Sequence, residues 1–395
     1  MSVRKRAWVS GAETKEAWIV TYTDAEGDRV QETFRKKRDA DARQAEIKVA
    51  LGRGIHTSRS RSITVGEAGK LWLATAEANR LERTTIDHYR QHLALHIVPY
   101  LGRTKLADLS PPMVRAFESH VGKKVSQATV RKIIGSLSGL LADAFDNGLV
   151  ARNVVRERSR HRGNGQVEKR HRGKLKFGID IPSIEEVGRM LAAAEGRWKP
   201  LLMVAALCGL RASELRGLRW ADVDLKNGKL HVCQRADRYN VMGSPKSAAG
   251  ERSVPILPDT VAVLREWRLR CPTGALDLVF PNGAGKIENL ANILIRGLAP
   301  TLVAAGITRV EKDDSGKVIA VKPKYSGLHC LRHFYASWCI NRRSAGGLEL
   351  PAKVVQERLG HSSITMTYDR YGHLFPGGDD TAEQAAAERA LLGAT

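Results

Sequence analysis

The chain has 395 residues, with 64 Lys and Arg against 42 Asp and Glu, so its formal net charge is +22. A cationic excess of this size predicts a polyanionic partner, with nucleic acid ahead of an anionic membrane surface. Five scattered cysteines without a CxxC pair argue against a disulfide framework or a zinc module, and the lack of a long apolar run predicts a soluble, cytoplasmic protein with no signal peptide or membrane span.

Residues 1–57 are predicted to form a small β-sheet module, too small for an enzyme but large enough to bind DNA. Two segments of strand composition, Ala17–Tyr22 and Arg29–Phe34, flank the turn signal Asp24–Gly27. The basic run Arg35–Arg38 then opens a helix. We expect a three-stranded sheet packed on one helix, in which the basic run is either a DNA contact or a solvated face.

Residues 63–155 are predicted to form a bundle of about four helices, because apolar residues recur there at helical spacing. Thr64 and Glu67 fit a capping box at the start of the first helix. The longest helix begins at Ser126 and ends at the C-cap signal Asn147–Gly148. Six basic residues could follow a DNA backbone, although each alone fits a solvated surface: Arg83, Arg90, Lys123, Lys124, Arg131 and Lys132.

A basic linker is predicted over residues 156–176. Lys and Arg dominate this segment, Glu157 and Glu168 are its acids, and several glycines separate the charges. Such a composition resists packing and suits contact with a phosphate backbone.

Residues 177–395 are predicted to form the largest domain, an α+β unit. An apolar helix over Pro200–Cys208 ends at Gly209, and two short strands, Leu230–Cys233 and Arg252–Ile256, surround a turn-rich segment. Further expected elements are a helix opened by Pro182–Glu186, a hairpin insertion between Ile307 and Lys324, and a last helix from Thr381. The whole chain is therefore predicted to be multidomain and mostly α, with small β elements.

Arg211 stands in an unusual place for a long cation. It follows an apolar helix and Gly209, where a guanidinium is expected only if an anion or a buried carboxylate meets it. The plain alternative is that it caps its helix or pairs with Glu214. Lys246 lies 35 positions later, in the turn-rich segment between the strands. The linker lysines compete with it, but none of them lies in a turn between strands.

A second group of candidates lies near the C-terminus. His329 and Arg332 are at i and i+3 and so share one helical face. His361 follows another helix end, and Tyr371 lies ten positions beyond it. A tyrosine in this place is a candidate nucleophile if the cations hold a phosphate beside it. His361 alone fits a loop histidine, and Tyr368 is a rival nucleophile.

These motifs resemble those of the tyrosine recombinases, or phage integrase family. The resemblance covers about residues 180–375 and rests on four boxes in order: Gly-Leu-Arg-x-Ser-Glu-Leu, Pro-Lys with a downstream Arg-x-Val-Pro, His-x-Leu-Arg-His, and Leu-Gly-His-Ser-Ser-Ile followed by Tyr-Gly-His. The helical bundle is similar to the family's core-type DNA-binding domain, and residues 1–57 are similar to its arm-type module. Asn153-Val in place of the frequent Asn-Pro is a departure outside the boxes.

The resemblance implies a phosphate clamp. Arg211 and Arg332 would hold the non-bridging oxygens of the scissile phosphate, because a guanidinium offers planar, bidentate and permanently charged donors. His361 would add a third donor. These cations take the place of a metal ion, so the resemblance implies no metal and no cofactor.

The resemblance also implies covalent chemistry. Tyr371 would attack phosphorus, form a 3′-phosphotyrosyl intermediate and release a 5′-hydroxyl, so no ATP is needed. Lys246 would be the general acid on the leaving oxygen, and His329 would assist proton transfer as acid or base. We prefer Tyr371 to Tyr368 because its Tyr-Gly-His-Leu context matches the family and Tyr368 follows His361 too closely.

Two neighbours are expected to support this set. Glu214 is expected to buttress Arg211. His333, at i+4 from His329, is predicted to be structural or to support the site. Metal binding by the two histidines is disfavoured, since neither an HExxH glutamate nor a nearby third ligand accompanies them.

The implied function is a site-specific recombinase, an integrase that exchanges four strands in pairs through a Holliday junction. Its expected partners are double-stranded DNA with core-type and arm-type sites and a homotetramer on that DNA. An accessory DNA-bending protein or a directionality factor is left open, as is the docking of the last helix on its own domain or on a neighbour. The alternatives are a noncatalytic DNA-binding regulator of the same fold, a chromosome-dimer resolvase and a type IB topoisomerase.

Overall fold

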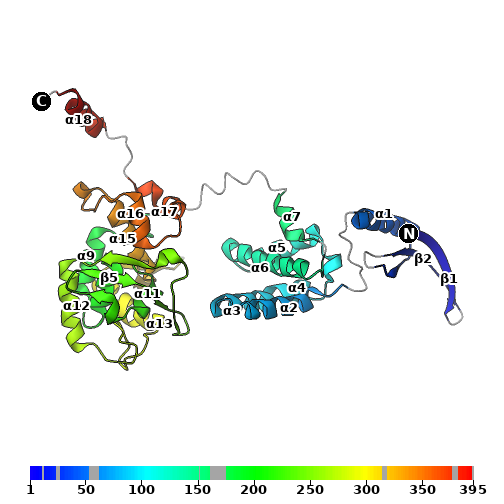
Figure 1. Cartoon of the computed structure of the whole chain (residues 1–395), viewed down its shortest axis with the longest axis horizontal. Helices are drawn as coiled ribbons and strands as arrows, with labels where there is room; N and C mark the ends of the chain where they lie inside the picture. The colour runs from blue at the N-terminus through cyan, green and yellow to red at the C-terminus, as the bar shows by residue number, and fades with distance from the viewer. Residues whose placement is uncertain are drawn as a thin grey trace. The chain divides into compact units, whose positions relative to one another are not determined.

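The computed structural model describes residues 1–10, 13–23, 27–52, 62–150, 152–160, 175–313, 318–375 and 381–393. The chain is mostly helical with small sheets, as predicted, and it divides into two units, Met1–Arg170 and His171–Thr395 (Figure 1). No helix in the described ranges is both long and apolar enough to cross a bilayer.

The N-terminal module is an antiparallel sheet of three strands covered by one helix, as expected. Its elements are β1 (Ser2–Ser10), β2 (Glu13–Thr23), β3 (Arg29–Phe34) and α1 (Lys37–Gly52), with strand order β1-β2-β3. Val20 and Tyr22 of β2 pack against Ala40 and Ile47 of α1 in a small core. Most of the expected turn, Asp24–Glu26, lies outside the described residues.

The helical bundle follows and has its own core around Phe117, Ile133 and Leu137. The capping box of Thr64 with Glu67 is formed, and the Ser126 side chain caps the longest helix, as the sequence predicts. The elements are α2 (Val65–Ala78), α3 (Arg83–His92), η1 (Leu93–Ile97), α4 (Val98–Leu101), η2 (Leu106–Asp108), α5 (Pro111–Gly122), α6 (Gln127–Asp146) and α7 (Val154–Arg160).

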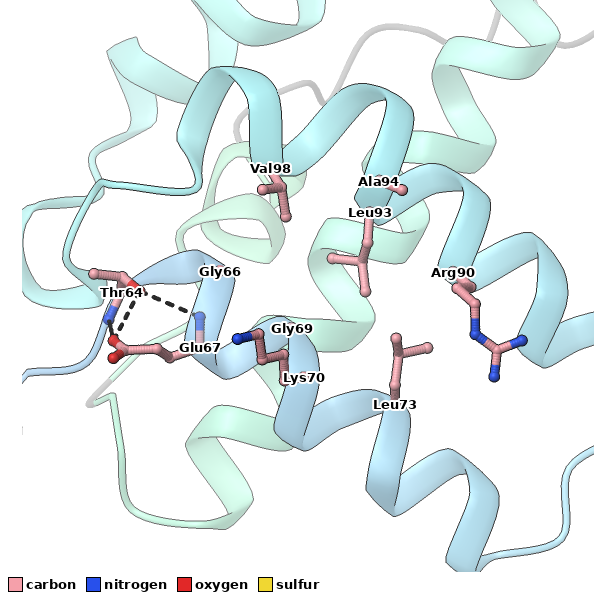
Figure 2. A pocket seen from close by; sticks show the side chains of 10 residues that line it. All are labelled: Thr64, Gly66, Glu67, Gly69, Lys70, Leu73, Arg90, Leu93, Ala94 and Val98. Carbon is pink, nitrogen blue, oxygen red and sulfur yellow. Dashed lines mark hydrogen bonds between the residues drawn. The ribbon is translucent and has the colours of Figure 1, made fainter.

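The second helix of the bundle contains a π-helical turn, η1, that the sequence pattern did not predict. The Val98 N–H donates to the Leu93 carbonyl, five residues back. Pro99 has no N–H, and its ring crowds the carbonyl of Leu95, so the helix widens at this point. Beside η1, an apolar groove lies between α2 and the α3–η1–α4 segment (Figure 2).

The first residues of the predicted linker are helical. Arg156–Arg160 belongs to α7, because Val154 and Val155 at the start of this helix pack into the bundle core. The expected linker start at Arg156 therefore falls inside a helix. Residues 161–174, the remainder of the predicted linker apart from Leu175 and Lys176, lie outside the described residues.

The second unit opens with helices and continues with small sheets, including a three-stranded antiparallel sheet of order β4-β5-β8. Ser183 and Glu186 form a capping box at its first helix, as the acidic start predicts. The elements of this half are α9 (Ile184–Ala193), α10 (Trp198–Leu207), α11 (Ala212–Gly217), η3 (Trp220–Asp222), β4 (Val223–Asp224), β5 (Lys229–Val232), β6 (Arg235–Ala236), β7 (Met242–Gly243), η4 (Ala248–Gly250), β8 (Arg252–Pro255) and α12 (Pro258–Arg270).

Among the described residues after α12, the named elements are helices apart from one antiparallel hairpin, β9 with β10, which forms the predicted insertion. The elements are α13 (Leu290–Asn292), η5 (Ile293–Leu298), α14 (Ala299–Ala304), β9 (Thr308–Lys312), β10 (Val318–Pro323), α15 (His329–Ile340), η6 (Arg343–Ala345), α16 (Ala352–Leu359), α17 (Ile364–Tyr371), η7 (Gly372–Leu374) and the expected last helix, α18 (Thr381–Leu392).

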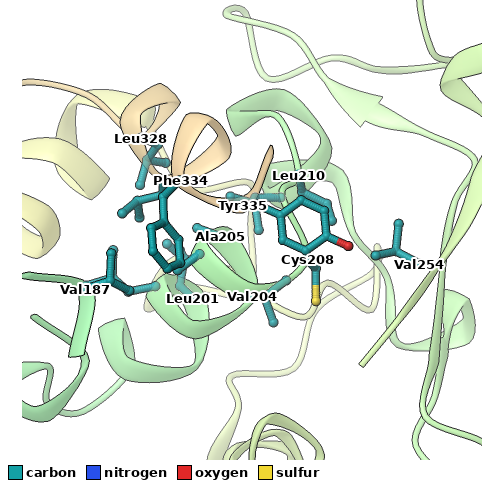
Figure 3. Packing of buried hydrophobic residues seen from close by; sticks show 14 of the residues in the cluster. Val187, Leu201, Val204, Ala205, Cys208, Leu210, Val254, Leu328, Phe334 and Tyr335 are labelled. Atoms are coloured by element: carbon teal, nitrogen blue, oxygen red, sulfur yellow. The ribbon is translucent and has the colours of Figure 1, made fainter. Parts of the chain in front are cut away.

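The core of this unit packs α10 against α15. Leu201 and Val204 of α10 lie in one cluster with Phe334 and Tyr335 of α15 (Figure 3). Gly209 follows α10 with φ +62°, and a Cβ at this position would come within 2.2 Å of the Tyr335 ring. Only glycine fits this turn, which brings the chain from α10 directly into the candidate site.

Candidate active site

A buried carboxylate, that of Glu214 in α11, organises one side of the site. Arg211, the residue before α11, donates to it from its backbone N–H at 2.8 Å and from Nη1 at 2.7 Å. Arg252 of β8 donates to the same carboxylate from Nη2 at 2.9 Å and from Nη1 at 3.3 Å. The side chains of Glu214 and Arg252 are 3% and 5% exposed, whereas that of Arg211 is 37% exposed. Glu214 therefore holds one buried and one accessible guanidinium.

The charge on Glu214 is secured by these partners. Burial opposes ionisation, but Arg252 and Arg211 outweigh it, and the pKa of the carboxyl lies below its ordinary value. Glu214 buttresses Arg211, as the sequence led us to expect. Its second partner, Arg252, comes from the predicted Arg-x-Val-Pro box, to which sequence reasoning had assigned no role.

Arg332 is the second guanidinium of the site and is buried in α15. Its Nη1 donates to the carbonyl of Gly209 at 2.7 Å, and its Nη2 donates to the carbonyl of Leu359. Burial, followed by the charge of Arg211, lowers its pKa to about 9, which leaves the group charged at neutral pH. Nη2 of Arg211 donates to the adjacent carbonyl, that of Gly360, at 3.1 Å. The two guanidiniums therefore converge on the end of α16.

His361 follows directly on that helix end. Gly360 stops α16 with φ +62°, the left-handed conformation typical of a glycine C-cap. Gln356 then fixes the turn through two hydrogen bonds. Its side-chain Nε2 donates to the His361 carbonyl at 3.0 Å, and its backbone carbonyl accepts the His361 N–H at 3.1 Å. Ser363 caps α17 through the Met366 N–H. The Leu-Gly-His-Ser-Ser-Ile box is thus a helix end and a helix start with His361 between them.

Tyr371 is the last residue of α17 and is buried among histidines. Its Oη lies 2.8 Å from Nδ1 of His333. The His361 ring stacks nearly parallel to the Tyr371 ring, at 6.2 Å between centroids, and its Nδ1 is hydrogen-bonded to Oγ1 of Thr367 at 2.9 Å. Burial raises the pKa of Tyr371, against the opposing charges of Arg332, Arg370 and Arg211.

The remaining candidates lie at the edge of this cluster. His329 opens α15, and its ring meets the His333 ring edge-on at 4.5 Å between centroids. Lys246 is exposed in the segment between β7 and β8, six positions before Arg252. Its contact with a bound phosphate stays a prediction. Tyr368 is 53% exposed and its ring lies beside Phe375, away from the hydrogen bond that Tyr371 makes.

Two buried histidines are neutral at pH 7. Burial, followed by the charges of Arg332 and Arg211, lowers the pKa of His361 to about 4. Burial, followed by His329 and Arg370, lowers the pKa of His333 to about 3. His333 was expected to be a supporting residue, and its contact with Tyr371, 38 positions away, has no signal in the sequence apart from its place in the His-x-Leu-Arg-His box.

These depressed pKa values predict that the folded protein loses stability in mild acid. As pH falls below the ordinary histidine pKa of about 6.5, the unfolded chain takes up protons that folded His333 and His361 do not, until pH nears about 4. One pKa unit corresponds to about 1.4 kcal/mol, so the free energy of unfolding should fall by a few kcal/mol. Urea denaturation at several pH values between about 7 and 4.5 measures this change.

The matched variants isolate the two groups. The double variant His333→Gln/His361→Gln should show a flatter dependence of unfolding free energy on pH over that window. His373→Gln, at an exposed position, should keep the wild-type slope. A wild-type stability that does not change between about pH 6.5 and 4.5 would contradict the neutral, buried state of both histidines.

Comparison with known protein families gives two matches along the chain. The model described as the phage integrase family matches residues 183–377, and the model of the phage integrase N-terminal SAM-like domain matches residues 64–120. The first spans Arg211, Glu214, Arg332, His361 and Tyr371, and the second lies within the helical bundle.

Individual relatives agree with these matches. The chain is 25% identical to a tyrosine recombinase XerC-like protein of Caldanaerobacter subterraneus subsp. tengcongensis, over 92% of this chain and 93% of the other. It is 28% identical to the integrase of Mycobacterium phage D29, over 52% of each chain.

Solved structures share the fold. The integrase of the Tn1549 transposon in complex with a circular intermediate DNA superposes with a TM-score of 0.61 at 16% identity, over 83% of this chain and all of the other. A λ integrase tetramer bound to a Holliday junction gives a TM-score of 0.54 at 15% identity, over 91% of this chain and 96% of the other.

The fold, the order of the boxes and the convergent arginines define a tyrosine recombinase catalytic domain. The chain belongs to the phage integrase family of tyrosine recombinases. It is a site-specific recombinase of the kind found in phages and mobile elements.

Proposed function

We propose that this chain integrates or excises a mobile element by cutting double-stranded DNA through Tyr371, with a 3′-phosphotyrosyl intermediate. The observation that carries this proposal is the convergence of Arg211 and Arg332 on consecutive carbonyls at the end of α16, directly before His361. A phosphate placed there meets two fixed guanidiniums, one of them accessible, with the phenol of Tyr371 among the neighbouring histidines.

Each part of the cluster has a role in phosphoryl transfer. Arg211 and Arg332 hold the non-bridging oxygens and stabilise the charge that develops on them, which is the main work in this reaction. His361 adds a donor. The oxygen of Tyr371 then forms a bond to phosphorus while the bond to the 5′ oxygen breaks.

The leaving oxygen needs a proton, and Lys246 is the proposed donor. It is exposed on the segment that runs from β7 to β8, and Arg252 at the start of β8 anchors the end of that segment to Glu214. A lysine on an exposed segment can reach a bound DNA strand without having to occupy the arginine cluster. No ATP is needed, since the phosphotyrosyl bond retains the energy of the phosphodiester.

Assembly on DNA is proposed by likeness to relatives. The λ integrase structure is a tetramer bound to a Holliday junction, and the Tn1549 integrase structure holds a circular intermediate DNA. The net charge of +22 supports a polyanionic partner for this chain. We therefore propose a homotetramer on core-type DNA sites that exchanges strands in pairs through a Holliday junction.

The N-terminal module supports an integrase over a chromosome-dimer resolvase, because it offers a second DNA-binding surface. Side chains alternate along β1, so Lys5 shares the face of Trp18 that α1 covers, whereas Arg4 and Arg6 point to the opposite face. Thr33 of β3 lies on that same face, opposite the buried Ile19 of β2. A β-surface with basic and polar side chains along its outer strands can enter the major groove, where side chains read base edges.

The double variant Arg4→Ala/Arg6→Ala is expected to weaken binding to arm-type duplexes and to leave cleavage of core sites intact. Each lost phosphate contact lowers the slope of log affinity against log salt by about 1, so the double variant should lose about 2. Duplexes enriched by the wild-type chain from a genomic pool, titrated at several salt concentrations, provide the measurement.

Lys5→Ala is the matched control for this pair. Lys5 lies between the two arginines in sequence but on the other face of the sheet, where it is half exposed and its Nζ is 2.6 Å from the Glu16 carboxylate. It should retain the wild-type salt slope. Equal losses in the control and the double variant would mean that the face with Arg4 and Arg6 does not bind DNA.

The function itself is tested by covalent trapping. Nicked duplexes from a genomic pool, in which the cleaved strand loses a short 5′-hydroxyl fragment, should accumulate a protein–DNA adduct that survives denaturation. Mapping the modified peptide should give Tyr371. A chain that binds these duplexes but forms no adduct on any of them would be a noncatalytic DNA-binding regulator instead.

A further inference from the structure

His333 is the group that touches the nucleophilic oxygen. Within the described ranges, the hydrogen bond at Oη of Tyr371 is the one to Nδ1 of His333, at 2.8 Å, and both side chains are buried. The reaction must remove a proton from this oxygen, because the phenol has an ordinary pKa near 10. The structure therefore places a ring nitrogen at proton-transfer distance from the reacting atom.

The other histidines of the site are engaged elsewhere. The His361 ring is nearly parallel to the Tyr371 ring, with an interplanar angle of 5°, so its nitrogens do not point at the phenol. Its Nδ1 is hydrogen-bonded to Oγ1 of Thr367. His329 contacts His333 edge-on. Neither is hydrogen-bonded to the phenolic oxygen in the described part of the chain.

The protonation state of His333 suits an acceptor. Burial holds the imidazole neutral at pH 7 by lowering its pKa to about 3. A neutral phenol and a neutral imidazole can bond in either direction, and the tautomer with the ring proton on Nε2 is the one in which Oη of Tyr371 donates and Nδ1 of His333 accepts. The proposed proton transfer uses this tautomer.

We propose that His333 is the general base that accepts the phenolic proton of Tyr371 during DNA cleavage, an inference that rests on the proposed function. As the Oη–H bond breaks, the proton moves to Nδ1 and its electron pair stays on oxygen. Oη then forms a bond to phosphorus, and the bond from phosphorus to the 5′ oxygen breaks. In religation the 5′-hydroxyl attacks, and Tyr371 leaves with the proton returned from His333.

The arriving DNA strengthens this base. Besides burial, the groups that depress the pKa of His333 include the nearby charges of Arg370 and Arg332. A phosphate anion bound by Arg332 offsets these charges, so the imidazole becomes more basic when substrate is in place. The proton transfer is thereby coupled to occupation of the clamp. This assignment differs from the one implied by family resemblance, in which His329 assists proton transfer.

The test separates a base from an acid by changing the leaving group. Cleavage is measured by adduct formation on duplexes with an ordinary 5′ oxygen or with sulfur in its place at the scissile phosphate. A thiolate leaves without being protonated, so sulfur should rescue a variant that lacks the acid and should not rescue one that lacks the base. His333→Ala should lose about 10²- to 10⁴-fold in rate on both duplexes. Lys246→Ala should lose activity on the oxygen duplex and regain it on the sulfur duplex.

Cleavage with imidazole added to the buffer provides a second measurement. If His333 had a merely structural role, added imidazole would not change the cleavage rate. Added imidazole should restore part of the cleavage by His333→Ala by filling the space left by the ring. His333→Gln keeps a polar group of similar size but cannot accept the proton, so it should stay inactive while folding and binding DNA normally. His373→Ala, which removes an exposed histidine that bonds the Leu175 carbonyl, is the matched control and should cleave at the wild-type rate.

Three results would overturn the proposal. His333→Gln could cleave at the wild-type rate, the defect of His333→Ala could disappear on the sulfur duplex, or imidazole could have no effect on a folded His333→Ala chain. Absence of any adduct with the wild-type chain would instead contradict the proposed function, so the two failures are distinguishable.

Discussion

Tyr371→Phe is expected to abolish the covalent protein–DNA adduct and to leave DNA affinity unchanged. Phenylalanine removes the attacking oxygen and no other heavy atom, so the ring still fills its buried place beside His361. The lost hydrogen bond to His333 should cost about 1 kcal/mol of stability, too little to unfold the domain. Denaturing gels of the trapped duplexes and a binding titration, run on the same protein, provide both measurements.

Tyr368→Phe is the matched control for this experiment. It makes the same chemical change three positions earlier in α17, at an exposed phenol. It should form the adduct at the wild-type rate. An adduct that persists in Tyr371→Phe and vanishes in Tyr368→Phe would transfer the nucleophile to Tyr368, and the hydrogen bond between Tyr371 and His333 would then be structural.

Arg332→Lys is expected to damage both catalysis and stability. Lysine keeps one positive charge but lacks the fork that reaches the carbonyls of Gly209 and Leu359. Leaving these buried groups without donors should cost about 2 to 3 kcal/mol in the free energy of unfolding. The loss of a fixed donor at the phosphate should reduce the rate of adduct formation by about 10²- to 10³-fold.

Arg211→Lys makes the same substitution at the more accessible guanidinium and separates the two effects. It should lower the cleavage rate to a similar degree with a much smaller loss of stability, because Glu214 keeps Arg252 as a buried partner. Urea denaturation and single-turnover cleavage report the two quantities. Equal stability losses in the two variants would contradict the structural role of Arg332 at the ends of α10 and α16.

Local signals in the sequence predicted the elements of the fold well. Two helix caps are examples, because their partners lie within three residues along the chain. The capping box of Thr64 with Glu67 and the Ser126 cap are both formed in the structure. The π-helical turn at Leu93–Ile97 was not predicted, although Pro99 could have indicated it, because apolar periodicity does not distinguish a widened turn from a regular one. The helix over the first residues of the predicted linker depends on how Val154 packs, which composition does not encode.

The site was predictable only in part, for a related reason. The boxes identify residues, but the contacts that organise them join distant segments. Arg252 reaches Glu214 across 38 positions, and His333 reaches Tyr371 across 38 positions. A single sequence shows how residues are spaced along a helix, but it does not show which helices pack against each other. For this reason the sequence predicts Arg211 as a partner of Glu214 but does not reveal Arg252, and it predicts only a structural or supporting role for His333.

Because two arginines share the Glu214 carboxylate, the site can distinguish the transition state from the substrate by charge. Arg211 and Arg252 bind the Glu214 carboxylate, and Arg332 lies near enough to feel its charge, so these four groups have two uncompensated positive charges. A phosphodiester in the ground state has one negative charge. When the deprotonated tyrosine adds to phosphorus, the five-coordinate species has two. The surplus positive charge of the cluster therefore matches the charge of the five-coordinate species rather than that of the substrate. The extra attraction arises as the new bond to phosphorus forms, and stabilisation at that stage is what accelerates a reaction.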